Sequence, residues 1–327
     1  MALDPRLRSR LVLPAFCAPM FLVSTPRLLV EACKAGIAAG TNPRNCRSLD
    51  QFEAEMLAVR AELDAWQQAH PAARVGPLAT NIDLKADPAT MRRCLAICAA
   101  ARVDIVVTVA GDPSEAIRQV HDAGGVVWHD ATSLRFAEKA IRAGADGIIA
   151  IGAGGGGHSG TVSHLALIPQ IRAIFDGTIV MAGAVSNGAA IRAAEVLGAD
   201  LAYLGTRFIA TQESGAPEAY KQMLVSQGAA DLLYTPAVNG VPANWLKASL
   251  EAVGLDLAAL PLPRGGHGTE HLPAGIRPWA NVWSAGQGIS LIHDIPSVSD
   301  LVRRLRREYV DACRAPDMAQ VAGDDNF

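Results

Sequence analysis

The chain has 327 residues, of which 50% are hydrophobic and 5% aromatic, and its formal net charge is −3. It shows no basic stripe, which argues against nucleic acid as a partner, and no apolar stretch approaches the roughly 20 residues of a membrane span. The first residues lack the continuous apolar segment of a signal peptide, and the six cysteines form no CxxC pair. We therefore expect a cytoplasmic protein with reduced cysteines and no membrane partner.

Apolar runs of strand length recur along the chain, with helical patterns between most of them. The runs lie at Leu11–Ala18, Gly36–Gly40, Val75–Ile82, Val103–Val109, Gly125–His129, Gly147–Ile151, Thr178–Ala182 and Leu201–Leu204. The helical patterns lie at 26–35, 48–70, 87–101, 113–123, 133–143, 165–175 and 188–197. Eight such units predict a (β/α)8 TIM barrel, and we prefer it to a doubly wound open sheet.

The clearest helix is Ser48–His70. Ser48 and Gln51 have the spacing of a capping box at its start. One face carries the apolar residues Phe52, Met56, Val59, Leu63 and Trp66. This period of 3.6 residues predicts an amphipathic helix packed on the barrel.

Three aspartates, Asp104, Asp146 and Asp200, each stand just before an apolar run. They are compatible with a repeated βα unit. They are equally compatible with the helix-to-strand turn that is common in α/β proteins.

The sequence changes in character after Phe208. Residues 212–290 carry helical stretches and a segment rich in proline and glycine, which contains His267 and His271, both expected at the solvated surface. We predict a (β/α)8 barrel over 1–211 and 291–327, with 212–290 as a helical insertion over its mouth. The insertion is either a moving lid or a fixed appendage. A closing helix is expected at Val298–Asp311.

The sixth predicted strand ends in a glycine run, IGAGGGGHSG at 151–160. In α/β proteins ligands bind at the carboxyl ends of strands. Gly155 and Gly156 let backbone come close to a flat or phosphorylated ligand. His158 ends the run, and its imidazole can transfer protons near neutral pH.

The next two strands end in MAGAVSNG and LGTRFIAT. In a TIM barrel the loops after strands seven and eight form the usual phosphate site. Gly183, Gly205 and Thr206 supply close backbone and a hydroxyl there, which favours a cofactor that carries a phosphate.

Other nucleotide and hydrolase motifs fit poorly. Residues 152–157 match GxGxxG, but they follow the sixth strand, and the next acidic residue, Asp176, precedes the following strand. No GK[ST] follows a glycine loop, and His158 and Thr161 break a GxSxG elbow around Ser159. Flavin mononucleotide (FMN) remains the best match, with its phosphate at the last two strands and its flat ring against glycine backbone.

At these motifs the chain resembles the nitronate monooxygenase (2-nitropropane dioxygenase) family of FMN-dependent barrels. The stretches that carry the resemblance are PAFCAPM at 14–20, IGAGGGGHSG at 151–160, MAGAVSNG with LGTRFIAT at 181–188 and 204–211, and VWSAGQGISLI at 282–292. They occur in family order along nearly the whole chain.

The resemblance implies roles for individual residues. His158 would be the active-site histidine beside the flavin. The cofactor contacts would be Ala18, Pro19, Met20, Asn81, His129, Gly155, Gly156, Gly183, Ala184, Gly205, Thr206 and Gln287. Of these, Ala18 to Met20 would pass along the ring, and Gly183, Gly205 and Thr206 would hold the phosphate.

The chain departs from the family pattern at three of its positions. Gly154 stands where the family's glycine run usually has an acidic residue, Ala184 where many members have glycine, and His129 where some have lysine. We expect the flavin site to survive these departures, whereas the substrate is put in doubt.

The resemblance implies oxidation of an alkyl nitronate, or of a nitroalkane, with dioxygen. Some members look like NAD(P)H-dependent reductases of quinones or enoyl substrates, and that activity is the alternative. A non-catalytic barrel is a third possibility, supported only by Gly154 and Ala184. A homo-oligomer is compatible with the sequence.

Overall fold

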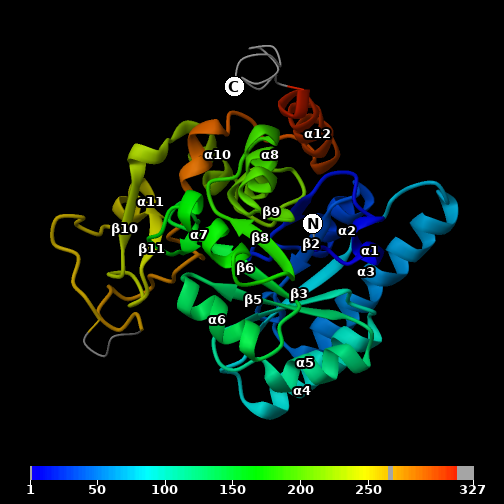
Figure 1. The fold of residues 1–327 in the computed structure, drawn as a ribbon. Helices are drawn as coiled ribbons and strands as arrows, with labels where there is room; N and C mark the ends of the chain where they lie inside the picture. The colour runs from blue at the N-terminus through cyan, green and yellow to red at the C-terminus, as the bar shows by residue number, and fades with distance from the viewer. Residues whose placement is uncertain (1, 264–267, 315–327) are drawn as a thin grey trace.

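A computed structural model describes residues 2–263 and 268–314, and His267 lies outside the described residues. Its centre is a closed barrel of parallel strands in the order β1-β2-β3-β4-β5-β6-β8-β9, with β9 beside β1 (Figure 1). The barrel strands are β1 (Ala15–Cys17), β2 (Ala38–Thr41), β3 (Leu78–Asp83), β4 (Ile105–Val109), β5 (Val126–Ala131), β6 (Gly147–Ile151), β8 (Thr178–Ala182) and β9 (Leu201–Leu204). The predicted TIM barrel is confirmed.

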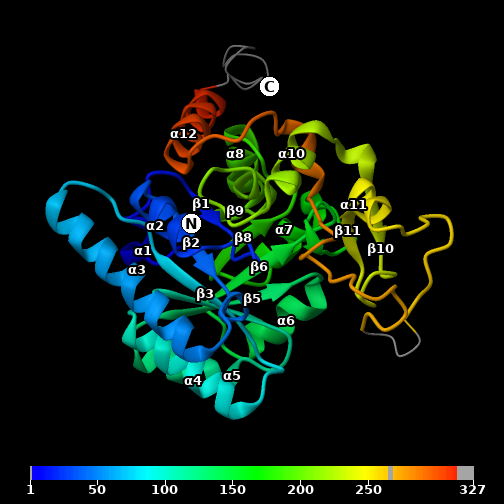
Figure 2. The same ribbon diagram turned by 180° about the vertical axis from the view of Figure 1, so that it is seen from behind.

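Helices surround the barrel, as Figures 1 and 2 show from opposite sides. The ring consists of α2 (Pro26–Lys34), α3 (Leu49–Ala69), α4 (Pro88–Ala100), α5 (Ser114–Asp122), α6 (Leu134–Arg142), α7 (His164–Arg172), α8 (Gly188–Leu197) and the closing helix α12 (Val298–Arg314). Among the described residues, no helix combines the length and the apolar character needed to cross a membrane.

The first predicted strand, 11–18, is longer than the observed β1. Leu11 is buried below the barrel, in one cluster with Leu7 of the short helix α1 (Pro5–Arg8) and with inward side chains such as Phe16. This cluster fills the barrel interior. The segment before β1 therefore belongs to a plug at the amino end and not to the sheet.

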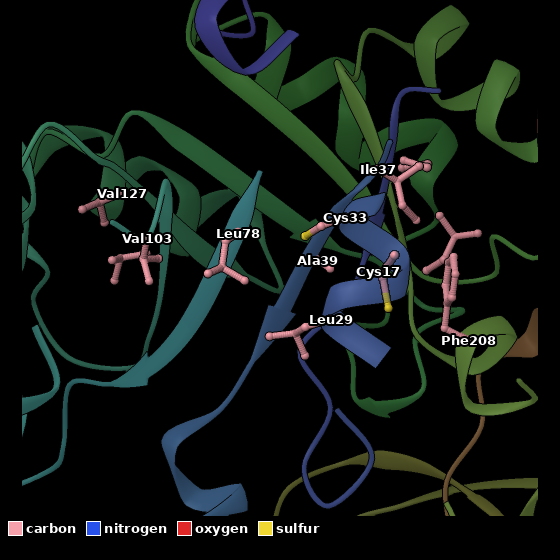
Figure 3. Close-up of a cluster of buried hydrophobic side chains, with 14 of the residues drawn as sticks. Cys17, Leu29, Cys33, Ile37, Ala39, Leu78, Val103, Val127 and Phe208 are labelled. Atoms are coloured by element: carbon pink, nitrogen blue, oxygen red, sulfur yellow. The ribbon is translucent and has the colours of Figure 1, made fainter. Parts of the chain in front are cut away.

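A second and larger core lies between the strands and the helix ring (Figure 3). Cys17 and Cys33 are fully enclosed there, next to Ile37 and Leu78. Burial raises the pKa of the Cys33 thiol to about 12. Cys17 is likewise a core residue.

The sequence signals of α3 are largely confirmed. The Ser48 side chain accepts a hydrogen bond from Gln51 N at 3.2 Å, but the Gln51 side chain accepts from Arg47 N, one residue before the cap. The second half of the predicted capping box is therefore displaced by one residue. Of the predicted apolar face, Phe52, Met56, Val59 and Leu63 are buried and Trp66 is half-buried.

The three aspartates before the strands all have the same structural role. Asp104 Oδ2 accepts from Leu78 N, Asp146 Oδ2 from Val127 N and Asp200 Oδ2 from Ile179 N, each at 2.8–2.9 Å. Each carboxylate also contacts a basic side chain, in turn Arg10, His121 and Arg172. These contacts tie neighbouring strands together at the amino end of the barrel.

The insertion is attached to the glycine run by a small sheet. After the single turn α9 (Thr206–Ile209) the chain forms α10 (Glu218–Ser226), β10 (Leu232–Thr235), β11 (Ala243–Leu246) and α11 (Lys247–Ala252). β11 pairs with β10 and, on its other edge, with β7 (Gly157–His158). Yellow and orange in Figures 1 and 2, β10, β11 and α11 lie beside the barrel on the side of α7.

Three short 3₁₀ turns complete the fold, η1 (Pro43–Asn45), η2 (Ala229–Asp231) and η3 (Gln287–Leu291). The closing helix α12 packs on α8 through its buried residues Leu301 and Leu305. Gly188, the first residue of α8, allows this close approach, because a Cβ there would lie 2.2 Å from Tyr309 N.

Candidate active site

A cavity of about 570 Å³ opens at the carboxyl ends of the barrel strands. Its floor consists of side chains at the ends of the strands, including Asn81 of β3, Asp130 of β5, Ile151 of β6 and Tyr203 of β9. Its volume is in the range of small-molecule and cofactor sites, and its place is the usual active-site face of this fold.

One wall of the cavity is glycine backbone. Gly155 and Gly156 from the run after β6 lie with Gly183 and Ala184 after β8, and with Gly205 and Thr206 after β9. Gly183 has φ of +119°, and a Cβ there would lie 2.7 Å from Gly155 N. Only glycine allows these two loops to approach so closely.

Gly205 differs from the other wall glycines because it has free space. The nearest atoms that its Cβ would meet are Met20 Sδ at 3.7 Å and Ala18 Cβ at 3.8 Å. Thr206 Oγ1 accepts a hydrogen bond from Gly286 N at 2.8 Å and keeps its own proton to donate. Bare backbone and a hydroxyl therefore face a region where a phosphate group would fit.

The two departures at Gly154 and Ala184 prove to be neighbours in space. A Cβ at Gly154 would lie 2.6 Å from the Cβ of Ala184. The Gly154 carbonyl also accepts from Ala184 N and from Gln287 N, both at 3.0 Å. The methyl group of Ala184 thus occupies space that a side chain at position 154 would need, so the two departures compensate each other.

His158 lies on β7 at the upper edge of the cavity, and its side chain is exposed. Its Nε2 is 3.1 Å from Asn239 Nδ2, and its ring meets Trp279 edge-on at a centroid distance of 5.3 Å. Since an amide nitrogen only donates, this contact fits a neutral imidazole whose Nε2 accepts. Such an imidazole can act as a base at a cavity wall.

Asn239 and Trp279 come from the insertion and line the same cavity. Neither was named from the sequence, because no local pattern distinguishes them. Trp279 adopts a left-handed backbone with φ of +62° and donates from Nε1 to Ser284 Oγ at 3.1 Å. The ring opposite His158 is therefore held in place by the insertion's own contacts.

Strand β5 extends beyond its predicted end at His129 to Ala131. Trp128 packs inside the barrel, so the alternation of a strand turns His129 outward and Asp130 inward. His129 is buried, with Nδ1 2.8 Å from Thr108 Oγ1, and its burial lowers its pKa. It does not line the cavity, and its role as a cofactor contact stays a prediction.

Asp130 occupies the inward position that sequence reasoning overlooked. It lines the cavity, and its Oδ1 is buried with no hydrogen-bond partner. Burial raises its pKa to about 7. The alternation counted from Trp128 is the sequence signal that would have identified it.

The remaining predicted contacts are distributed as follows. Ala18, Pro19 and Met20 line the cavity after β1, and Asn81 lines it from β3 and accepts from Asn42 Nδ2 at 3.2 Å. Gln287 is exposed at the start of η3 and does not line the cavity, whereas its neighbours Gly286 and Gly288 do. Its backbone N–H, bonded to Gly154, holds the returning segment against the glycine run.

These residues fit FMN as a group. The fit depends on the close glycine backbone of the wall, the open space beside Gly205, and the buried Oδ1 of Asp130, which has no partner within the protein. A ligand with a phosphate and a flat polar ring would use all three. Gly183, Gly205 and Thr206 would hold the phosphate, while Met20, Asn81 and Asp130 would lie along the ring.

Comparisons with known proteins agree with this arrangement. A family model described as nitronate monooxygenase matches residues 11–308. A nitronate monooxygenase of Paraburkholderia phytofirmans is 29% identical over 90% of this chain and 92% of its own length. Nitroalkane oxidase from Streptomyces ansochromogenes is 25% identical in sequence. Its crystal structure superposes with a TM-score of 0.73 over 95% of this chain and 99% of that one.

A Rhodococcus jostii protein is also similar, at 33% identity over 53% of this chain. It is named (3aS,4S,5R,7aS)-5-hydroxy-7a-methyl-1-oxo-octahydro-1H-indene-4-carboxyl-CoA dehydrogenase. The match spans about half of that relative, 49% of its length. Proteins with different reactions thus share parts of this sequence.

Proposed function

The chain belongs to the nitronate monooxygenase family, and on this basis we propose that it is an FMN-dependent oxidoreductase that oxidises alkyl nitronates with dioxygen. The observation that carries the proposal is the meeting of His158 with the glycine wall around one cavity at the carboxyl end of the barrel. When bound, FMN supplies the electron transfer between the nitronate and dioxygen.

His158 would act on the substrate. A neutral Nε2 can accept the α-proton of a nitroalkane, and a protonated imidazole can stabilise the negative oxygens of a nitronate. Asn239 lies against the same nitrogen and would hold the ring in position until substrate arrives.

The insertion supports this role by positioning the histidine at the edge of the cavity. Trp279 covers one edge of the imidazole, and the strand pair β7–β11 fixes the backbone of Gly157 and His158. The proton-transfer group is thus placed before substrate binds, which lowers the cost of ordering it in the reaction.

The wall glycines would position the cofactor. Because a peptide N–H brought close to a phosphate donates without side-chain entropy loss, glycine backbone suits this task. The floor side chains Asn81 and Tyr203 would limit how deeply the ring enters the barrel.

An anaerobic mixing experiment tests the proposal. The FMN-loaded protein is mixed with an alkyl nitronate, then separately with NADH and NADPH, while flavin absorbance is followed. Bleaching by the nitronate, reversed by air, is the expected result. Bleaching by NADH or NADPH but not by the nitronate would contradict it and indicate a reductase of quinones or enoyl substrates.

A further inference from the structure

Asp130 is unusual among the polar residues of the cavity floor. Asn81, two strands away, has a partner in Asn42. Among the described residues no side-chain hydrogen bond or ion pair involves Asp130, and its Oδ1 is buried alone. A buried polar atom without a partner is unfavourable, and one that lines a cavity can be satisfied by a ligand bound there.

No lysine or arginine among the described residues forms an ion pair with the Asp130 carboxylate. Tyr203 from β9 interacts with it, and the pKa of Tyr203 is raised by burial and by Asp130. Arg44 and His158 line the same cavity. Its neighbour His129 points outward to Thr108.

We infer that Asp130 takes up a proton when FMN fills the cavity and is held there as the neutral acid. This inference rests on the proposed FMN site. A bound cofactor would cover the part of Asp130 that faces the cavity, and among the described residues no lysine or arginine pairs with the carboxylate to replace the lost solvent. Removing water disfavours the charged form of a carboxyl group, so the complex would favour protonation.

The sign of the pH dependence follows from linkage. The free protein already has its Asp130 pKa raised to about 7 by burial, and the complex would raise it further. FMN would then bind most tightly below pH 7, where Asp130 is protonated in both states. Above pH 7 the affinity would fall by up to about tenfold per pH unit, since one proton must be taken up.

Other groups also titrate in this range, so a matched variant is needed. The FMN phosphate has a second pKa near 6, and His158 lies at the cavity edge. Asp130→Asn removes only the carboxyl titration and keeps the shape of the side chain. Asp122→Asn is the control, because Asp122 is exposed at the end of α5 and does not line the cavity.

The experiment measures the FMN dissociation constant of the apoprotein and both variants at pH 5.5, 7.0 and 8.5 by flavin fluorescence. We expect wild type and Asp122→Asn to lose up to about thirty-fold more affinity than Asp130→Asn between pH 5.5 and 8.5. Equal pH profiles for wild type and Asp130→Asn would overturn the inference, as would a wild-type protein that gains affinity relative to the variant as pH rises.

A second measurement needs no variant. Calorimetric titration of wild type with FMN at pH 7.5, in two buffers of different ionisation enthalpy, counts the protons exchanged. We expect net uptake of up to one proton per FMN, since part of Asp130 is already protonated in the free protein. Zero uptake or net release would overturn the inference while leaving the FMN site intact. No FMN binding at any pH would overturn both proposals.

Discussion

Aspartate side chains differ in their hydrogen bonding between the two ends of the barrel. At the amino end, Asp104, Asp146 and Asp200 each accept a backbone N–H and contact a basic side chain. At the carboxyl end, Asp130 has an oxygen with no partner. Paired carboxylates stabilise the fold, whereas an unpaired one is available to a ligand.

The glycines at the two ends of the barrel also differ, in the space around them. Gly144, in the turn before β6 at the amino end, has φ of +93° and open space around its missing side chain. Gly183, at the carboxyl end, has a positive φ and also a neighbouring loop in contact. Gly144 allows a tight turn, whereas Gly183 allows two loops of the cavity wall to pack together. The following predictions test this division of fold and site.

The largest effect is expected for His158→Ala. Loss of the proton-transfer group should reduce turnover of a nitroalkane by about 10²- to 10⁴-fold, with FMN content unchanged. Steady-state oxygen consumption and the flavin spectrum measure the two quantities. His121→Ala is the control, since this histidine contacts Asp146 at the amino end and should keep full turnover. A His158→Ala protein with its flavin and normal turnover would refute the assigned role.

Asp200→Ala should be the most damaging change at the amino end. The carboxylate is 1% exposed and accepts from Ala2 N, Ile179 N and Arg172. Its removal should lower the free energy of unfolding by about 2–4 kcal/mol, because buried donors lose their partner. Chemical denaturation measures this.

The control for that variant is Asp122→Ala, at the exposed end of α5, where we expect a change within about 0.5 kcal/mol. FMN affinity should stay unchanged in both proteins. If Asp200→Ala unfolds at the wild-type denaturant concentration, the amino-end network does not stabilise the fold as described.

Gly183→Ala and Gly144→Ala compare a glycine of the cavity wall with a glycine of a turn. Both substitutions place a side chain at positive φ and should cost about 1 kcal/mol of stability. Only Gly183→Ala also pushes against Gly155, so it alone should weaken FMN binding, by about tenfold or more. Thermal unfolding and flavin titration measure the two effects. Equal FMN affinities in the two variants would show that the wall is not part of the cofactor site.

The smallest effect is the coupling energy between the two compensating departures. Gly154→Ala should cost about 1–2 kcal/mol of stability, because its Cβ would meet Ala184 at 2.6 Å. In an Ala184→Gly background most of this cost should vanish, leaving a coupling energy of about 1 kcal/mol. A double-mutant cycle on unfolding free energies tests it. Additive effects would mean that the two positions are independent.

Much of this protein follows from local sequence. The alternation of apolar runs and helical periods predicted the barrel, and the Ser48 cap and apolar face predicted α3. The glycine run and the two following loops came together at one cavity because the carboxyl ends of parallel strands share one edge of the sheet. These features depend on short-range backbone preferences and on a regular topology.

Other features were decided only by tertiary structure. Packing decided which face of β5 points into the barrel. Trp128 lies inside, so the alternation of the strand turns Asp130, and not His129, toward the cavity. Asn239 and Trp279 reach His158 from more distant parts of the chain. Gly154 and Ala184 became a pair only when two loops packed together. Such contacts depend on long-range packing, and no short stretch of the sequence predicts them.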